Sequence, residues 1–391
     1  MQLVVPYFME LESYMIDARS VWSGAIDCKA VYRMPIGYGA YLSPFVAALG
    51  DAAGVKTANM VALAGVLGAA LALFAAIRGH VHPVAAPVLR LPFALTWDRA
   101  AASLLLLALI AYPYTILDVS RTTEALPATA LVVTFLWAMF TKPRFATVVA
   151  VALCIGVGTH VRANMVSLIL PAALWIGWRS DEGLARRCVL GLVGLALVAA
   201  AYAAYSMAST GCGWYTPTNG GYNIFAGNNP FSAEFLWAQQ NGEYSIVPAM
   251  KALGITVTDA FQVPQETYFA QARQYALSCP ACIVKLMAVK AAVFFSPRLL
   301  NANNIAEVVV QSTLMATTFA ALCLALWRFL RTRAYLEGMI LLLVVAYAAP
   351  FIVTNADPRM RFPLDIVALF YIVLRADEWL RRRFSQGAPR P

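Results

Sequence analysis

Charged residues are scarce in this sequence. They make up 13% of the 391 residues, whereas hydrophobic residues make up 61%, and the mean hydropathy is +0.68. Soluble domains are usually about 45–50% apolar and about 25% charged. No soluble core of this size can hold the excess of apolar side chains, so lipid must cover it. The composition therefore predicts an integral membrane protein.

Signatures of nucleic-acid and nucleotide binding are absent as well. The sequence contains no zinc-finger pattern, no Walker loop and no run of the RNA-recognition type. The formal net charge of +9 alone would suit a nucleic-acid partner. However, the Lys and Arg residues stand between apolar runs, which is the pattern of membrane topology. We therefore expect no nucleic-acid partner.

Cysteines are too few and too scattered to predict a disulfide framework, since the chain has only seven. Cys154, Cys188 and Cys323 stand in or beside apolar runs, where we expect them to be packing residues. Cys279 and Cys282 have the spacing of a redox pair but no βαβ context. The lack of a βαβ context favours a chance pattern or a structural disulfide over a thioredoxin-like role.

Apolar runs of spanning length recur along the chain. The first 50 residues contain neither a full run nor a signal-peptide pattern. Several of the later runs are near the lower limit of about 17–25 residues for a spanning helix. The candidate spans are 57–77, 101–117, 125–141, 145–161, 163–178, 188–208, 307–327, 336–354 and 363–376. We predict an all-α, polytopic integral membrane protein with about nine to ten transmembrane helices and a large outer-face loop region.

The longest polar interruption runs from Ser209 to Ala306. Within it, the segment Thr218–Pro230 is rich in Gly and Asn, which favour turns, so we predict that it folds as a loop. The run 281–295 is apolar but contains Lys285 and Lys290, which is typical of an interfacial helix. A long polar insertion beside spanning helices indicates where a water-soluble substrate is handled.

The basic residues sort by loop and predict the orientation in the membrane. The loops at 118–124, 160–164, 209–306 and 355–361 are poorer in Lys and Arg for their length than the loops that alternate with them. The richer loops should be cytoplasmic, which places residues 1–55 and 209–306 outside. An outside N-terminus implies either insertion without a leader or an upstream helix missing from this reading frame, and we favour the second.

The chain therefore divides into five segments. They are a first outer loop with juxtamembrane helices (1–55), transmembrane helices (56–208), a large outer loop with an interfacial helix (209–306), C-terminal transmembrane helices (307–376) and a basic cytoplasmic tail (377–391).

Carboxylates and arginines cluster on the predicted outer face. Such residues beside spanning helices usually pair with one another or face a water-filled site. A catalyst that transfers a sugar from a lipid phosphate needs a carboxylate to take the proton of the attacking hydroxyl. It also needs positive groups to hold the phosphate that leaves. The outer clusters contain both residue types.

Five motifs in these clusters resemble those of one enzyme family. In chain order they are Glu10 to Tyr14 with Arg33 to Tyr38, Ser120 to Glu124, Thr159 to Arg162, the loop Thr218 to Pro230, and Arg359-Met360-Arg361-Phe362-Pro363. Their order and spacing over nearly the whole chain resemble the polyprenyl-phosphate-sugar glycosyltransferases of the C superfamily (GT-C). In particular, the chain resembles the bacterial relatives of protein O-mannosyltransferases and lipid A aminoarabinose transferases. The chain departs from the family at Glu10, where Asp is usual, and at Met360, where Tyr is usual.

The resemblance implies an inverting hexosyl or pentosyl transferase of the bacterial inner membrane with its active site on the periplasmic face. The donor would be a sugar on polyprenyl (undecaprenyl) phosphate, and the acceptor an envelope glycan, lipid or protein. Glu10, or else Glu12, would be the catalytic base. Arg162, Arg359 and Arg361 would bind the donor phosphate. Family members differ in metal use, so a divalent cation (Mg²⁺ or Mn²⁺) stays open.

The remaining implied roles concern the acceptor and the sugar. Glu124 and Asp118 would position the acceptor or a metal. The sugar or acceptor pocket would be shaped by Asn219, Tyr222, Asn223, Asn228 and Asn229.

Simpler interpretations of the same residues stay open. Glu10 and Glu12 could be solvated charges on a surface helix, and Glu124 could cap the helix that begins near Ala125. Arg359 and Arg361 could contact lipid headgroups. The Asn and Gly residues of the loop could serve only its turns.

Two other functions compete with transfer. A lipid-linked sugar transporter or flippase usually has polar residues in mid-helix and internal repeats, and this chain shows no repeat and almost no charge inside its apolar runs. A non-catalytic relative in envelope assembly would fit the Glu-for-Asp change and the missing first helix.

Overall fold

The computed structural model describes residues 5–28, 34–79, 97–120, 122–237, 246–254, 262–295, 305–356 and 358–385. Within these ranges the chain is helical and contains no strand, which confirms the predicted all-α class. The side chains of Glu10, Glu12 and Arg359 lie outside the described part.

The helices follow one another in nearly continuous order. The first ten elements are α1 (Val5–Ser23), α2 (Gly37–Leu49), α3 (Asp51–Gly79), α4 (Trp97–Ile110), α5 (Pro113–Ser120), α6 (Ala125–Met139), α7 (Phe145–Val161), η1 (Ala163–Leu168), α8 (Ile169–Arg179) and α9 (Leu184–Thr210). The others are α10 (Gly220–Gly227), α11 (Ser232–Trp237), α12 (Ile246–Ala252), α13 (Gln265–Ser278), α14 (Pro280–Phe294), α15 (Ile305–Thr332), α16 (Tyr335–Val353), η4 (Pro358–Arg361) and α17 (Phe362–Ser385).

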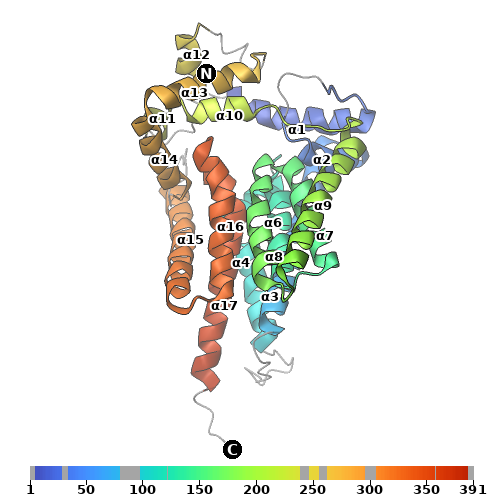
Figure 1. The fold of residues 1–391 in the computed structure, drawn as a ribbon, viewed down its shortest axis with the longest axis vertical. Helices are drawn as coiled ribbons and strands as arrows, with labels where there is room; N and C mark the ends of the chain where they lie inside the picture. Colours follow the sequence, from blue (N-terminus) through green and yellow to red (C-terminus); the bar gives the residue numbers. More distant parts are fainter. Residues whose placement is uncertain are drawn as a thin grey trace, which may run out of the picture.

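Two layers are evident in Figure 1. The long helices, α3, α6 to α9 and α15 to α17, run side by side along the longest axis. The helices α1, α10 and α13 cross the upper ends of this bundle, with α12 above them (Figure 1). We call α1, α2 and α10 to α13 the upper layer, and the opposite end of the bundle the basic end.

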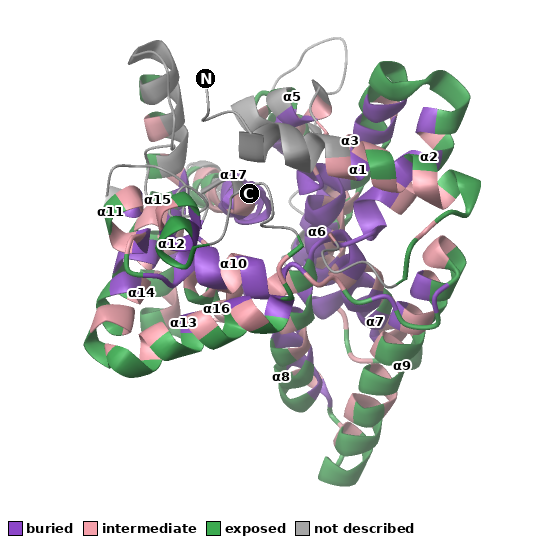
Figure 2. Cartoon of the chain, turned by 90° about the horizontal axis from the view of Figure 1, so that it is seen from above, coloured by how far each residue is buried: buried purple, intermediate pink, exposed green. Residues whose placement is uncertain are grey.

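The surface of the bundle is suited to lipid. Three described helices are long and apolar enough to cross a membrane: Asp51–Ile77 within α3, Leu184–Thr210 (α9) and Tyr335–Val353 (α16). Only 6% of the spanning window of α9 is buried inside the protein, at a hydropathy of 2.1, and Figure 2 shows its exposed length at one edge. An apolar helix this exposed needs a lipid environment.

All nine candidate spans overlap described helices, but among the described residues only those in α3, α9 and α16 are both long and apolar enough to cross a membrane alone. The pair α13–α14 would count as a fourth span if its two helices, bent by 109° at Cys279, formed one. The count of nine to ten spans therefore stays a prediction.

One apolar core holds the bundle together. It joins α3, α4, α6, α7, α8, α16 and α17 through fully buried side chains such as Val66, Phe135, Trp175 and Leu343. Phe74 of α3 packs edge-on against Phe370 of α17, with 6.3 Å between ring centroids. Aromatic pairs of this geometry add to the stabilisation from burial. The core thus fixes the upper ends of α6, α7 and α17, where the polar clusters lie.

The prediction that Thr218–Pro230 folds as a loop is wrong for most of the segment. Residues Gly220–Gly227 form the helix α10. Its buried face packs on α13, with the Phe225 ring 5.5 Å and the Tyr222 ring 5.8 Å from the ring of Tyr268. Packing of these aromatic side chains outweighs the low helix propensity of Gly and Asn. The turn prediction holds for the residues that follow, where the Asn229 side chain accepts a hydrogen bond from the Phe231 amide at 2.9 Å.

Two disulfides lie at the upper end, contrary to the expectation drawn from the scattered cysteines. Cys28, after α1, is bonded to Cys212, after α9, across a separation of 184 residues. Cys279 and Cys282 form a disulfide at the joint of α13 and α14, so the structural alternative for this CxxC is the one observed. The free cysteines among the described residues are Cys154, Cys188 and Cys323. Cys154 is buried, as expected for a packing residue, whereas Cys188 and Cys323 are exposed, so the packing role expected for them is not observed within the protein.

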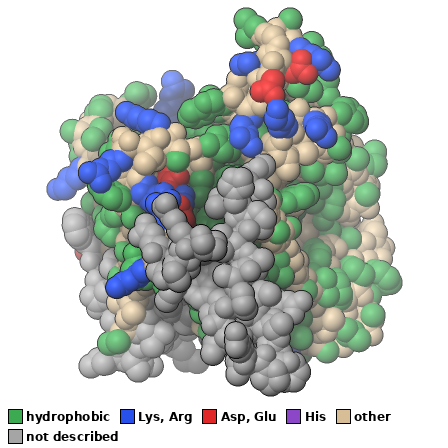
Figure 3. All heavy atoms as spheres, turned by 90° about the horizontal axis from the view of Figure 1, so that it is seen from below, with side chains coloured by type: hydrophobic (Ala, Val, Ile, Leu, Met, Phe, Trp, Pro, Cys, Tyr) green, Lys and Arg blue, Asp and Glu red, His purple; other side chains and the backbone are tan. Residues whose placement is uncertain are grey.

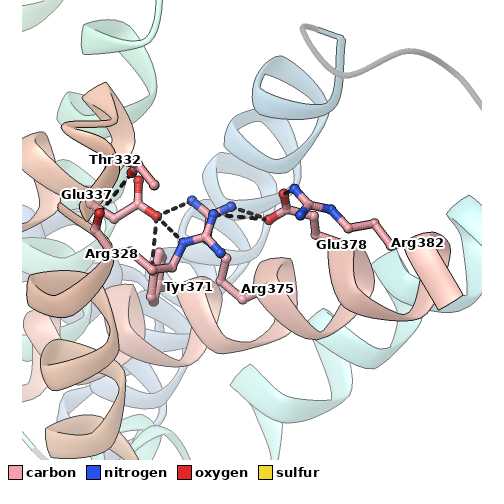
Figure 4. Close-up of polar contacts among 7 residues, drawn as sticks. All are labelled: Arg328, Thr332, Glu337, Tyr371, Arg375, Glu378 and Arg382. Atoms are coloured by element: carbon pink, nitrogen blue, oxygen red, sulfur yellow. Dashed lines mark hydrogen bonds and ion pairs between the residues drawn. The ribbon is translucent and has the colours of Figure 1, made fainter. Parts of the chain in front are cut away.

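The basic end is fastened by a buried carboxylate. Glu337, at the start of α16, accepts hydrogen bonds from Arg328 Nε at 2.9 Å, Arg375 Nη2 at 2.5 Å and the Tyr371 hydroxyl at 3.0 Å. Its side chain is fully buried. Glu378 pairs with Arg375 and Arg382 in the same network (Figure 4). These contacts tie α15, α16 and α17 together.

Lys and Arg side chains gather on the face at this end (Figure 3). The described helix ends and loops there contribute Lys142, Arg144, Arg179, Arg186, Arg187, Arg331, Arg333, Arg382 and Arg383.

Candidate active site

A buried ion pair stands where α6 begins and α7 ends. Arg162 Nη2 and Nε donate to Glu124 Oε1 at 2.7 and 3.1 Å. The Tyr14 hydroxyl of α1 donates to the other carboxylate oxygen at 3.1 Å. Only 7% of the Arg162 side chain and 11% of the Glu124 side chain is exposed. Three motifs that lie far apart in the sequence therefore meet at one point beneath the upper layer.

The backbone explains how these side chains reach one another. Glu124 occupies the N-cap position of α6, but its side chain makes no capping hydrogen bond. Arg162 ends α7 in an extended conformation, with φ −150° and ψ 111°, before the chain turns into η1. This break directs the arginine to Glu124 instead of along the helix. Capping alone therefore does not account for Glu124.

Both groups of the pair are ionised, and they lie outside the spanning helices. Burial by itself would raise the pKa of Glu124, but the Arg162 guanidinium and the Tyr14 hydroxyl hold it below its usual value. Burial would lower the pKa of Arg162, and the neighbouring Tyr347 and Glu124 raise it instead. The pair is thus a fixed positive and negative charge in a site shielded from water.

Arg162 also reaches the last motif. Its Nη1 donates to the Tyr347 hydroxyl at 2.8 Å and to the Met360 carbonyl at 3.1 Å. Asn164 donates to the Tyr347 carbonyl at 3.2 Å. Met360 takes part in this contact through its backbone oxygen, so the contact does not depend on the side chain at this position.

Tyr38 connects the first motif to the second. Its hydroxyl donates to Asn59 Oδ1 at 3.1 Å and accepts from the Thr123 amide at 3.1 Å. Asn59 in turn donates to the Asp118 carbonyl at 2.9 Å. The Asp118 side chain is buried. The segment that leads to Glu124 is therefore held from α2 and α3 through a tyrosine and an asparagine.

Gly37 allows this approach of α2. A Cβ on Gly37 would lie 2.5 Å from the backbone carbon of His160, so no larger residue fits without moving α7. His160 Nε2 donates a hydrogen bond to the Tyr202 carbonyl at 2.9 Å, and its ring stacks on the Tyr202 ring. It therefore packs within the bundle.

Arg361 is buried in a second ion pair. Its Nε donates to Asp365 Oδ1 at 2.9 Å, and the Tyr112 hydroxyl donates to Asp365 Oδ2 at 2.9 Å. Arg361 Nη1 donates to the Phe294 carbonyl at the end of α14 at 2.6 Å. The pairing of Arg361 with Asp365, four residues along the chain, shows a structured junction and not only a contact with lipid headgroups.

The asparagines of the former loop segment differ in their surroundings. Asn228 Nδ2 donates to the carbonyls of Ile224 and Val353 at 2.8 and 2.9 Å. Asn229 Nδ2 donates to the Phe225 carbonyl at 2.8 Å. The remaining two asparagines are Asn219, which contacts Met34, and Asn223, which is partly exposed on α10. Tyr222, from the same segment, packs on Tyr268.

Sequence reasoning missed Lys290 as a member of this region. The ammonium of Lys290 in α14 donates to Asn228 Oδ1 at 2.8 Å and to the Thr354 carbonyl at 2.7 Å. The only signal in the sequence was a lysine inside an apolar run, which also fits an interfacial helix.

The described residues do not fit a metal at Glu124. One of its oxygens is bonded to Arg162 and the other to Tyr14, so a cation would have to displace a guanidinium. In the described part of the chain, no group of three or more His, Cys, Asp or Glu residues is placed to hold an ion.

No family model and no curated protein matches this chain. Among solved structures, the apo form of ArnT from Cupriavidus metallidurans is similar over 90% of this chain and 72% of that chain, at 16% identity and a TM-score of 0.32. ArnT is a lipid A aminoarabinose transferase, a member of the family that the sequence motifs resemble. A TM-score and an identity this low carry no argument about activity.

Proposed function

We propose that this chain is a GT-C membrane glycosyltransferase that moves a sugar from polyprenyl (undecaprenyl) phosphate to a hydroxyl of a cell-envelope acceptor. The observation that supports the proposal most is the convergence of distant motifs. Four of the five motifs each contribute one residue to a continuous series of hydrogen bonds, which runs from Tyr14 to Glu124, Arg162 and Met360. A buried charge pair at the end of membrane helices is expensive, which favours a functional role.

In the proposed reaction, the acceptor hydroxyl attacks the anomeric carbon of the donor sugar. Glu10, or else Glu12, takes the hydroxyl proton as the new carbon–oxygen bond forms. The bond from the anomeric carbon to the phosphate oxygen breaks, and polyprenyl phosphate leaves with the electron pair. A single displacement of this kind inverts the anomeric configuration.

The positive residues would stabilise the charge that develops on the leaving phosphate. We assign this role to Arg162, Arg359 and Arg361. Glu124 and Asp118 would position the acceptor, and Asn219, Tyr222, Asn223, Asn228 and Asn229 would shape the pocket for the sugar or acceptor.

We further propose that the protein lies in the bacterial inner membrane with its upper layer on the periplasmic side. Two independent features support this orientation. Disulfides persist in oxidising compartments, and both Cys28–Cys212 and Cys279–Cys282 lie at the upper end. The basic residues gather at the opposite end, as cytoplasmic loops do (Figure 3).

A non-catalytic relative in envelope assembly is the second candidate. It is favoured by the fact that Glu124 and Arg162 bond to each other and to Tyr14, Tyr347 and Met360, which would also suit a purely structural pair.

Reconstitution in proteoliposomes separates the candidates. The purified chain would be supplied with radiolabelled polyprenyl-phosphate sugars and a mixture of envelope acceptors. We expect label to become covalently attached to an acceptor. Label that crosses the membrane while still attached to the lipid would instead support a flippase. Absence of both, with several donors, would contradict transfer and favour the non-catalytic relative.

A further inference from the structure

Lys290 is a fully buried lysine whose ammonium is bonded to neutral groups. Its Nζ donates to Asn228 Oδ1 at 2.8 Å, to the Thr354 carbonyl at 2.7 Å and to the Val353 carbonyl at 3.2 Å. The side chain is 0% exposed. Among the described residues, no carboxylate forms an ion pair with Lys290.

An ammonium in such a position is expensive, because burial removes its water and no anion replaces it. Part of this cost is offset by the end of α16. Val353 is the last residue of that helix and Thr354 its C-cap, and the negative end of a helix dipole favours a cation. The three oxygens match the three donors of an ammonium. Lys290 therefore closes the C-terminus of α16 from a neighbouring helix.

The same joint holds the turn after α10. Asn228 accepts from Lys290 and donates to Val353, so one side chain links α14, α16 and the turn. Gly227 packs directly on the Thr354 carbonyl, which would collide with any Cβ at that position. The backbone of the turn at Gly227 therefore packs directly against the backbone at the end of α16.

The joint also reaches the arginine proposed to bind phosphate. Phe294 lies one helical turn after Lys290 on α14, and its carbonyl accepts the hydrogen bond from Arg361 at 2.6 Å. If α14 shifts on α16, this acceptor moves and Arg361 loses a fixed partner. Lys290 and the acceptor of Arg361 therefore lie one helical turn apart on α14.

We propose that Lys290 is a positioning residue that holds the Asn228 turn and α14 on the end of α16, and thereby orients Arg361 for the donor phosphate. The first half of this role concerns the fold alone. The second half rests on the proposed function.

The test compares Lys290→Met with Lys285→Met. Methionine has a similar length but carries neither the charge nor the donors, and Lys285 is an exposed lysine on the same helix. Hydrogen–deuterium exchange in nanodiscs would follow the peptides that contain residues 222–232 and 350–361. We expect exchange on the order of tenfold faster in both peptides of Lys290→Met, and no change in Lys285→Met. Equal exchange in the wild type and Lys290→Met would overturn the proposal.

Kinetics test the second half. We expect Lys290→Met to raise KM for the polyprenyl-phosphate sugar on the order of tenfold, whereas a merely structural loss of folded enzyme would lower the apparent kcat at unchanged KM. The KM of Lys285→Met should equal that of the wild type. An unchanged KM in Lys290→Met would overturn the link to Arg361.

Two further comparisons keep these outcomes separate. If Lys290→Met does not fold, Lys290→Gln replaces it, because glutamine keeps an amide donor without the charge. Its exchange is measured in the same two peptides. Exchange at the wild-type rate in both peptides would show that the charge is not needed. If the wild type itself transfers no sugar, the proposed function fails, and the exchange comparison still decides whether Lys290 holds the turn.

Discussion

Removing one partner of the Glu124–Arg162 pair should destabilise the protein much more than the loss of a surface ion pair. Arg162→Met leaves a buried carboxylate whose only described side-chain partner is the Tyr14 hydroxyl, and Glu124→Leu leaves a buried guanidinium. Deleting one member of a buried pair typically costs about 3–5 kcal/mol of unfolding free energy. The double variant removes both charges, so its cost should fall short of the sum of the singles by about 2–3 kcal/mol.

Equilibrium unfolding in detergent measures this coupling. The exposed pair Arg186–Glu182, at 2.9 Å with side chains 70% and 40% exposed, provides a matched control. Its coupling energy should stay below about 1 kcal/mol. Additive costs in the Glu124→Leu/Arg162→Met cycle would show that neither charge depends on the other, which would contradict a coupled buried pair.

The pH dependence of the coupling has a defined sign. The folded pKa of Glu124 lies below 4.5, the ordinary pKa of a glutamate side chain. Stability from the pair is therefore fully present above pH 4.5 and is lost as the pH falls through the folded pKa. Coupling measured at pH 7 and at pH 6 should agree, and a rise in coupling on acidification would contradict the assignment.

Three more predictions concern other parts of the fold. Gly227→Ala should push the turn away from the Thr354 carbonyl and lower the unfolding temperature. Gly191→Ala, at a glycine with open space around it, should not lower it. Equal unfolding temperatures for the two variants would contradict the close packing at Gly227. Burial raises the pKa of Asp17 from 3.8 to about 7, so the contribution of this carboxyl to stability is lost as the pH rises through about 7. Asp17→Asn should therefore flatten the decline in unfolding temperature between pH 5 and pH 8. An unchanged slope would show that Asp17 is not the titrating group. Glu337→Gln should cost about 3–5 kcal/mol of unfolding free energy, because two arginines lose a buried carboxylate, yet leave KM for the donor unchanged; a raised KM would show that the basic end and the candidate site are coupled.

Much of the fold follows from hydrophobic runs alone. Each predicted span coincides with a helix because a segment of that length and apolarity can satisfy its backbone in lipid only as a helix. The polar stretch behaved differently. Residues 220–227 have the composition of a turn, but Tyr222 and Phe225 pack on α13, and that tertiary contact determined the helix.

The sequence pattern predicts residue types for the candidate site but not the contacts between them. Glu124 and Arg162 are both charged residues at predicted helix ends, and the structure brings them together. Nothing in their sequence spacing predicts that they bond to each other. The same holds for Cys28–Cys212, whose partners are 184 residues apart. The sequence does not predict the buried position of Lys290, because a lysine in an apolar helix is equally typical of the membrane interface.

Glu10 is the proposed catalytic base, with Glu12 as the alternative, and matched variants of the two distinguish them. Sugar transfer in proteoliposomes would be measured for the wild type, Glu10→Gln and Glu12→Gln, with equal amounts of folded protein. We expect Glu10→Gln to abolish sugar transfer and Glu12→Gln to retain it. The reverse pattern would assign the catalytic base to Glu12. Equal turnover in all three proteins would contradict the assignment of the base to this helix.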